Sequence, residues 1–532
     1  MRLHFSFIAH VSIVIKLSAL VCIPVLVGYG SLALQKEPVS VQTLLVQGLE
    51  PENTPEDSTQ ATTLLVRAQS AESPHPVRTP QIWCLLQQSR RRSSYPTDMM
   101  QIICNKNGKD GELSRIDAQI LIPGRGPPLA HASLIFNTNI ILFVGKTNQL
   151  DAKYKTLEAI EVPVLMPGLW DSHLHLNGAT MYGADVLAST HQTVAGARLA
   201  RDVVALLNAG FTSVRELAGY GVQMAQVIEE GWLPGPNIYS AVSVLSMTAG
   251  HGDPRNIPLH VFQDQIAHGL PSCLCDGPSE CTKAVRIQIR NGAKVIKVAA
   301  SGGVTTKGND IQARQFSDEE LSAIVAEAER NNMLVAAHCH GNASILAALR
   351  AGCKTIEHAT FLEDDGVKLM VERDGMLIAT RTSLEMSIQH PEAWTPAQYE
   401  QLKAIKKRHK ESYSKAVRAG VRIALGTDIA TSAVDKPWNR HGINGMEFKY
   451  AVEAGMTPLQ AIEAGTANAP ETLGPQAPKS GWLKEGYAAD FIALNKSPLD
   501  DIEVLGDAKN ITHVWKGAKL FKKNGQPINI LG

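Results

Sequence analysis

The sequence has no net charge of either sign and few aromatic side chains. Its 532 residues contain 51 Lys and Arg against 51 Asp and Glu, and Phe, Trp and Tyr make up 5%. The balanced charge argues against nucleic-acid binding, which normally comes with a basic excess. Hydrophobic residues make up 44% of the chain, enough for a large core, which excludes wholesale disorder.

One long apolar run, residues 17–34, lies near the N-terminus. Its length falls between that of a signal-peptide core and that of a membrane-spanning helix. A proline and two glycines weaken a long helix here, so residues 1–35 are predicted to be a secretory signal peptide, with a membrane anchor as the alternative. The protein would then be secreted or membrane-anchored, with membrane contact only if the segment is retained. It would be cytoplasmic if the segment has no targeting role.

Residues 36–98 are rich in Ser, Thr, Gln, Pro and Glu and show little helix or strand periodicity. This composition predicts a disordered linker, because such a segment cannot bury enough apolar surface to order itself.

From residue 163 to 480, short apolar runs alternate with amphipathic helical segments. Eight candidate strands occur between Val164 and Asp428, and segments such as 318–332 carry apolar residues at three- and four-residue spacing. Eight strand–helix units predict a (β/α)8 TIM barrel, an α/β fold whose active site lies at the C-terminal ends of its strands. An open doubly wound sheet is the alternative, although no G-x-G-x-x-G follows any strand.

Residues 101–162 and 481–532, which flank the barrel segment, contain β-like runs. Neither segment has enough surface to bury alone. Together they are predicted to form a small β-sandwich domain, with the barrel inserted between its two halves.

Three of the eight cysteines, Cys273, Cys275 and Cys281, lie in one segment that reads as a loop. Their spacing permits a disulfide in an oxidising compartment and free thiols in a reducing one, so the sequence leaves the pairing open.

Two histidines, His173 and His175, lie one residue apart at the end of the first predicted barrel strand. Because side chains alternate along a strand, both imidazoles point to the same face and can hold one metal ion. Further ligand-type residues lie near the C-terminal ends of other predicted strands, where a barrel gathers side chains that are distant in sequence. These residues are Lys297, His338, His358 and Asp428.

The charge of such a site can be counted. Two divalent ions bring four positive charges, neutral imidazoles add none, and Asp428 adds one negative charge. Carbamylated Lys297 would be an anion able to hold both ions, and with a bridging hydroxide the total falls to about +1, suitable for a Lewis acid. The alternative for Lys297 is an amine that neutralises a nearby carboxylate.

The motifs around these residues resemble the amidohydrolase superfamily: PGLWDSHLHL, VIKVAASGGV, VAAHCHG, TIEHAT and LGTD, with the closing TPLQAIEAGTANAPETLG and SGWLKEGYAADFIAL. The resemblance runs from about Gln101 to the C-terminus. It is greatest to the metal-dependent carboxypeptidase and imidazolonepropionase-like group, which includes the fungal ochratoxinases. It implies two divalent ions, with zinc as the expected metal. His173, His175 and Asp428 would hold one ion, His338 and His358 the other, and Lys297 would bridge them.

The same resemblance implies a binuclear amidohydrolase that cleaves the C–N bond of an N-acyl amino acid or dipeptide, as an amidase or carboxypeptidase. Asp428 is implied to take the proton of the hydroxide and pass it to the leaving nitrogen. One alternative is a cyclic-amide hydrolase of the imidazolonepropionase type, whose members often use one ion and lack the bridging lysine. Another is a non-catalytic scaffold, which would normally have lost metal ligands. A homo-oligomer that takes a small-molecule amide is expected.

Substrate-binding candidates lie close to these ligands. His340 shares a strand face with His338 and is expected either to contact the substrate in catalysis or to orient His338. His251, in the motif TAGHGDPR, and Tyr220 are expected to bind substrate. Arg215 could contact substrate or form a salt bridge within the barrel. Its motif, RELAGYG, departs from the RD-x-GG pattern of relatives. The substrate specificity that this loop gives to relatives is therefore not assigned to this sequence.

Overall fold

The computed structural model describes residues 113–528, apart from 182, 305, 307 and 436–438. The predicted signal peptide and linker lie outside these residues, as do the first residues of the segment predicted to begin the β-sandwich. Within the described part of the chain, no helix is long and apolar enough to cross a membrane.

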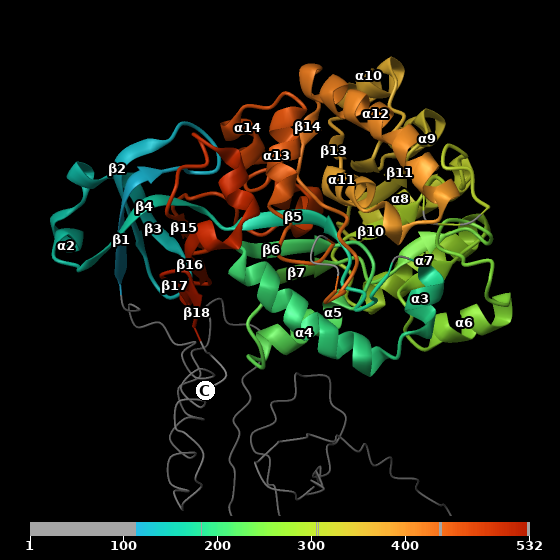
Figure 1. The fold of residues 1–532 in the computed structure, drawn as a ribbon, viewed down its shortest axis with the longest axis horizontal. Helices are drawn as coiled ribbons and strands as arrows, with labels where there is room; N and C mark the ends of the chain where they lie inside the picture. The colour runs from blue at the N-terminus through green and yellow to red at the C-terminus, as the bar shows by residue number, and fades with distance from the viewer. Residues whose placement is uncertain (1–112, 182, 305, 307, 436–438, 529–532) are drawn as a thin grey trace, which may run out of the picture. The chain divides into compact units, whose positions relative to one another are not determined.

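Two parallel sheets carry the central part of the chain (Figure 1). The first has three strands, β5 (Leu169–Leu174), β6 (Phe211–Glu216) and β7 (Asn237–Ser240). The second has seven strands, in the spatial order β14 (Arg422–Ile423), β13 (Met376–Ile378), β12 (Thr355–His358), β11 (Val335–Cys339), β10 (Ile296–Ala299), β8 (Val244–Ser246) and β9 (Ser272–Leu274).

Backbone hydrogen bonds join the edges of these two sheets. Ser172 N donates to Leu425 O at 2.8 Å on one side, and Lys294 N donates to Ser240 O at 2.8 Å on the other. Between β7 and β8 the chain turns through Val242, which has a left-handed φ of 69°. The predicted α/β fold is therefore confirmed, but the described strands do not form one continuously paired, closed barrel.

Helices follow most of these strands, as expected for an α/β chain. Ser317 begins α8 with the capping box that its sequence predicts, because its Oγ accepts from Glu320 N at 3.2 Å and the Glu320 carboxylate accepts from Ser317 N at 2.7 Å. The helices are α2 (Ala152–Lys155), α3 (Ala184–Ser189), α4 (Gln192–Asn208), α5 (Gly221–Glu229), α6 (Leu259–Ala267), α7 (Gly277–Arg290), α8 (Asp318–Arg330), α9 (Asn342–Ala351), α10 (Asp364–Glu372), α11 (Arg381–Gln389), α12 (Pro396–Arg418), α13 (Met446–Glu453) and α14 (Pro458–Ala464).

The two flanking segments come together, as predicted, but in a single sheet. Strand β4 pairs with β15 in antiparallel register, with Leu165 opposite Ala493. A sandwich of two facing sheets is not confirmed, because the described strands of both segments are continuous with one another. In spatial order they are β18 (Gln526–Pro527), β17 (Lys519–Lys523), β16 (Ile511–Lys516), β15 (Phe491–Leu494), β4 (Ala159–Pro167), β1 (Ser114–Leu121), β2 (Leu129–Phe136) and β3 (Ile141–Lys146).

The cysteine-containing segment is more ordered than its composition predicts. It forms the edge strand β9, which pairs with β8, and then begins α7. Cys273, Cys275 and Cys281 are buried free thiols, and the sulfurs of Cys275 and Cys281 lie 3.7 Å apart. The sequence had left open whether these cysteines pair, and the structure shows them unpaired.

Candidate metal centre

Three of the predicted ligands meet at the C-terminal end of β5. The chain around Asp428 lies against this strand, since Asp428 N donates to His173 O at 2.6 Å and Ile429 O accepts from His175 N at 3.0 Å. This pairing places Asp428 Oδ1 3.4 Å from His173 Nε2 and 3.2 Å from His175 Nε2. The H-x-H motif therefore delivers two imidazoles to one carboxylate, as the alternation of side chains predicts.

Lys297 reaches the same point from β10. Its side chain is buried, and its Nζ lies 3.4 Å from His173 Nε2. Burial lowers the pKa of the amine to about 8, despite the opposing attraction of Glu357 and Asp428. Burial therefore favours the neutral amine, which is the form that reacts with CO2.

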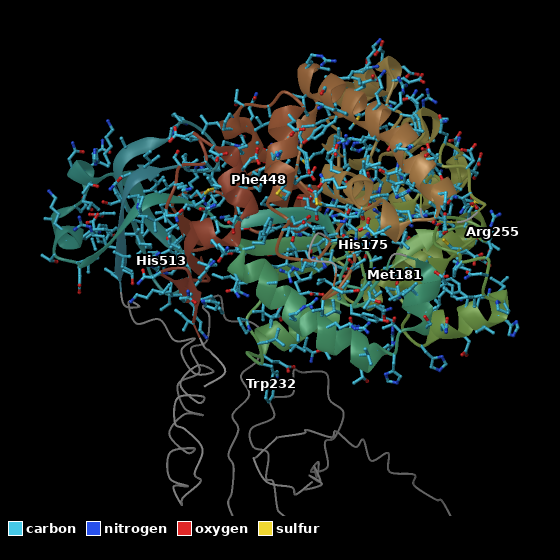
Figure 2. The ribbon with its side chains drawn as sticks, viewed as in Figure 1. His175, Met181, Trp232, Arg255, Phe448 and His513 are labelled. Carbon is cyan, nitrogen blue, oxygen red and sulfur yellow. The ribbon has the colours of Figure 1, made fainter. Side chains whose placement is uncertain are left out.

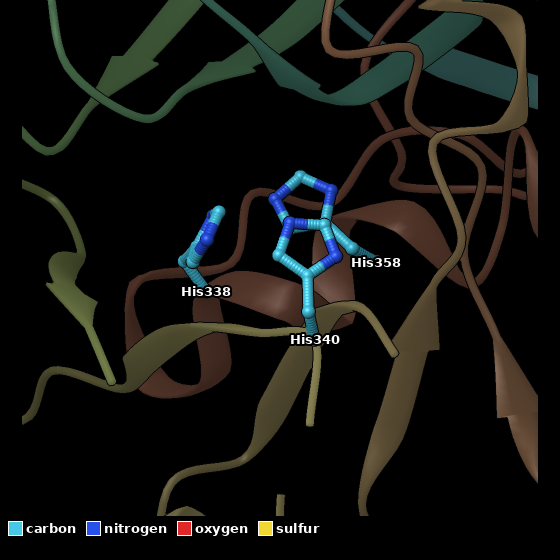
Figure 3. A group of neighbouring side chains, drawn as sticks. All are labelled: His338, His340 and His358. Carbon is cyan, nitrogen blue, oxygen red and sulfur yellow. The ribbon is translucent and has the colours of Figure 1, made fainter. Parts of the chain in front are cut away.

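Three more imidazoles face one another beside this group (Figure 3). The ring centroid of His338 lies 4.5 Å from that of His358 and 4.7 Å from that of His340, and the His340 and His358 centroids are 4.8 Å apart. Their available ligand atoms all lie within 4.8 Å of one another, as do those of His173, His358 and Asp428. His358 thus belongs to both groups and joins them into one site.

Hydrogen bonds fix which ring nitrogen of two ligands can bind a metal. His175 Nδ1 lies 2.8 Å from the carbonyl oxygen of Ala218, which can only accept, so Nδ1 carries the proton. His358 Nδ1 lies 2.7 Å from Thr380 Oγ1, whose own proton goes to Ala379 O. In both residues Nε2 is therefore the ring nitrogen that is available to a metal ion.

His338 is oriented in the opposite way. Its Nε2 lies 3.1 Å from the carbonyl oxygen of Gly302, so this nitrogen donates a proton and Nδ1 keeps the free electron pair. His338 would therefore bind a metal through Nδ1, whereas His175 and His358 would bind it through Nε2.

Left-handed backbone at two ligands makes this convergence feasible. His358 has a φ of 70° and Asp428 a φ of 59°, values that are uncommon for residues other than glycine. In a regular strand the neighbours Glu357 and His358 would point to opposite faces. Here Glu357 Oε2 lies 2.7 Å from His173 Nδ1, and the His358 ring centroid lies 5.0 Å from that of His173. Both side chains therefore reach the same imidazole.

The electrostatics of the cluster suit a cation. Burial holds the pKa of His338 and of His358 well below the usual range and lowers that of His340 to about 3, so these imidazoles are neutral at physiological pH. For Asp428, burial opposes ionisation, but the favourable interaction with the nearby His173 and His175 side chains outweighs it and holds the pKa well below its usual range. Neutral imidazoles beside an ionised carboxylate form a donor set that fits a divalent ion such as zinc.

A cavity of about 320 Å³ opens onto the cluster. Its lining includes all six predicted ligands and also Met181. Met181 and one of the ligands, His175, are labelled in Figure 2. One part of its wall is apolar and packs as a small cluster of its own. This apolar wall consists of Val304, Leu384, Trp394, Leu402 and Ile405. The cavity is of a size that accommodates a small molecule.

The candidate substrate residues divide into two groups. His340 and His251 line the cavity, and the His251 ring stacks on that of His338 with centroids 4.3 Å apart. Tyr220 does not line it, because as the N-cap of α5 it packs against the core, with a hydroxyl that has no hydrogen-bond partner among the described residues. Arg215 is fully buried and forms the salt bridge that was one of its two expected roles, to Glu357 at 2.9 Å.

Several site residues were not identified from the sequence. Glu357, Thr360 and Thr380 each hydrogen-bond to a histidine of the cluster, and Asn177 lines the cavity with a buried Oδ1 that has no partner among the described residues. Glu357 could have been identified from the sequence, because it is a charged residue inside the apolar strand motif TIEHAT. No sequence feature pointed to Thr360 or Thr380, because their hydrogen bonds depend on the tertiary fold.

Comparisons with known proteins agree with this geometry. The chain is 45% identical to an ochratoxinase of Aspergillus niger over 433 residues, which cover 78% of this chain and 88% of that relative. The crystal structure of Aspergillus niger ochratoxinase superposes with a TM-score of 0.72 over 78% of this chain and 96% of that one, at 44% identity. A prolidase complexed with N-methylphosphonate-L-proline gives a TM-score of 0.71 at 29% identity, over 78% of this chain and 100% of that one.

A more distant relative is an imidazolonepropionase of Deinococcus deserti. It is 22% identical over 397 residues, which cover 73% of this chain and 91% of that relative. The family model described as the amidohydrolase family matches residues 164–521, which include every residue of the cluster. The chain belongs to the amidohydrolase family and is a hydrolase that acts on carbon–nitrogen amide bonds.

Proposed function

We propose that this protein is a binuclear metal-dependent amidohydrolase, built on a (β/α)8 barrel, that cleaves the amide of an N-acyl amino acid or dipeptide. The observation that carries the proposal is the convergence of six ligand-type side chains, from five separate segments of the chain, on one cluster. His173, His175 and Asp428 would hold one ion, and His338 and His358 the other. A carbamate on Lys297 would join the two.

Zinc is the proposed metal, because the donor set combines imidazole nitrogens with carboxylate-type oxygens. When bound, two such ions would supply an activated water and polarise the carbonyl of the amide. Proton transfer and the orientation of the substrate would be carried out by side chains of the protein.

Asp428 is the proposed general base. Its carboxylate is ionised, and its side chain is 30% exposed at the cavity, so it can take a proton and carry it to the leaving nitrogen. His340 is the proposed donor to the substrate oxygen. Its Nδ1 lies 2.7 Å from Thr360 Oγ1, a hydroxyl able to donate, which would leave a proton on Nε2 for the substrate.

The relatives and the cavity support the substrate class. Two of the similar proteins are an ochratoxinase and a prolidase, and both names point to substrates with an amide bond. The apolar wall would bind an apolar side group of the substrate, since removing such a group from water is favourable. His251, stacked on His338, would contact the polar part near the scissile bond.

A cyclic-amide hydrolase of the imidazolonepropionase type is the second candidate. Its supporting observation is the relative from Deinococcus deserti, at 22% identity against 45% for the ochratoxinase. The buried amine of Lys297 beside His173 favours the first candidate, because relatives of the imidazolonepropionase type often lack a bridging lysine.

A hydrolysis screen tests the proposal. Purified protein is assayed on N-acyl amino acids, on dipeptides that end in proline or phenylalanine, and on cyclic amides. Release of an amino acid from the first two classes, abolished by Asp428→Asn and retained by Asp365→Asn, would support it. Asp365 is an exposed carboxylate on α10, outside the cavity. Cleavage of cyclic amides alone would favour the second candidate.

A further inference from the structure

We infer that Glu357 is a positioning residue for the metal centre, acting through His173, and that Arg215 holds Glu357 in place. The inference rests on the proposed function, because it assigns a role in metal binding to side chains that do not themselves line the cavity. All three residues are completely buried.

The contact between Glu357 and His173 fixes the state of the imidazole. Glu357 Oε2 lies 2.7 Å from His173 Nδ1, and an ionised carboxylate can only accept a hydrogen bond. His173 Nδ1 therefore carries the proton, and Nε2 keeps its electron pair. That Nε2 faces Lys297 Nζ and Asp428 Oδ1, each 3.4 Å away, where a metal would bind.

The carboxylate is itself held on every side. Arg215 Nη2 donates to Oε1 at 2.9 Å and to Oε2 at 3.0 Å, and Thr355 Oγ1 donates to Oε1 at 2.6 Å. Together with His173 Nδ1, these donors give each oxygen of Glu357 two hydrogen bonds. The two hydrogen bonds from the Arg215 guanidinium form a buried ion pair, which keeps the carboxylate of Glu357 an anion.

Arg215 also hydrogen-bonds to the backbone of the strand that carries His173. Its Nε donates to the carbonyl oxygen of Ser172 at 2.5 Å, and its Nη1 donates to Thr355 Oγ1 at 3.1 Å. One guanidinium thus fixes both the backbone next to His173 and the carboxylate that orients the imidazole. An ion pair that served only to join strands would need no bond to a ring of the cavity. Carboxylates that accept from the second nitrogen of a metal-binding histidine fix its orientation and raise its basicity.

The test compares two buried glutamates. Glu357→Gln removes the negative charge, leaves Arg215 without a counter-ion, and presents an amide that can donate to His173 instead of accepting. Glu447→Gln is the matched control, because Glu447 on α13 is also buried but accepts from Arg381 N and from Thr382. Each protein is stripped of metal, its folding is checked by urea unfolding, and its zinc affinity is measured by competition with a chromophoric chelator.

Zinc affinity is expected to fall about 10- to 100-fold in Glu357→Gln and to stay at the wild-type value in Glu447→Gln. The visible spectrum of the cobalt-substituted protein, which reports the ligand geometry, is expected to change in the first variant only. Wild-type affinity and spectrum in folded Glu357→Gln would overturn the inference.

A second variant covers the case in which Glu357→Gln does not fold. Glu357→Asp keeps the charge for Arg215, but its side chain is one methylene shorter and cannot bond both Arg215 and His173. Weakened zinc binding in this variant supports the inference, and wild-type binding overturns it. Wild-type zinc binding by the variants would overturn only the inference. Absence of zinc binding by the wild-type chain would overturn the proposed function, so the two failures are distinguishable.

Discussion

The amine of Lys297 lies 3.4 Å from Nε2 of His173, although 124 residues separate them in the sequence. One side chain comes from β10 and the other from β5, which belong to different sheets of the described structure. Burial makes the amine easier to deprotonate, and this is the condition for carbamylation. The contact therefore joins the two halves of the proposed metal centre.

Lys297→Ala is expected to lose bound metal and activity, because the site would lack its central anion. Short-chain carboxylates such as acetate or propionate are expected to restore part of both, since they can occupy the space of the carbamate. Metal content and hydrolysis rates check this prediction. Lys294→Ala, which changes an exposed lysine three residues earlier, is the matched control. Full activity of Lys297→Ala without added carboxylate would refute the role of the lysine.

Gly303→Ala is expected to weaken substrate binding through His251. A Cβ at Gly303 would lie 2.1 Å from His251 Cε1, so the imidazole would have to leave its stack on His338. The expected result is a raised KM, measured by steady-state kinetics on the substrate found in the screen.

Gly196→Ala is the matched control for this change. Gly196 lies in α4, and a Cβ there would meet no heavy atom within 4 Å. The kinetics should stay at wild-type values, while the free energy of unfolding should rise by about 0.5–1 kcal/mol, since alanine restricts the unfolded chain. Unchanged kinetics in Gly303→Ala would show that His251 does not contact substrate.

The metal-free protein is expected to lose stability in mild acid, partly through His409. Burial and the positive charge of Arg381 lower the pKa of His409 to about 3, whereas an unfolded histidine titrates near 6.5. Between these values the unfolded chain binds a proton that the native state does not. Stability therefore falls as pH falls, by about 1.4 kcal/mol per pH unit for one such group.

Urea unfolding at pH 7, 6 and 5 measures this slope, and His409→Gln is expected to flatten it by the contribution of one proton. The other buried histidines titrate in both proteins, so their contribution cancels in the difference. Equal slopes for the wild type and the variant would contradict the assigned role of His409.

Much of the α/β fold, and the side chains that meet in the candidate metal centre, could be predicted from the sequence. The apolar runs gave the strands, and the capping box at Ser317 gave the start of α8. Ligand-type residues at the ends of those runs gave His173, His175 and Lys297, because parallel strands bring their C-terminal ends together. These features depend on local patterns that the fold preserves.

The rest depends on tertiary contacts and unusual backbone. Strand alternation would separate Glu357 from His358, and the left-handed φ of 70° that brings both to His173 leaves no mark in the sequence. Tyr220 follows the C-terminal end of β6, and this position led to the prediction that it binds substrate. Its side chain instead packs against the core. Three residues of the apolar wall, Leu384, Leu402 and Ile405, lie in helices. The periodicity of these helices shows an apolar face but does not show that part of this face meets a cavity.

The central claim is that six side chains from five separate segments of the chain hold two divalent ions. Elemental analysis of active, freshly purified protein tests it most directly, together with activity after the metal is removed with a chelator and added back. We expect about two divalent ions per chain, with activity that is lost and regained with them. Full activity in protein that contains one ion or none would contradict the account.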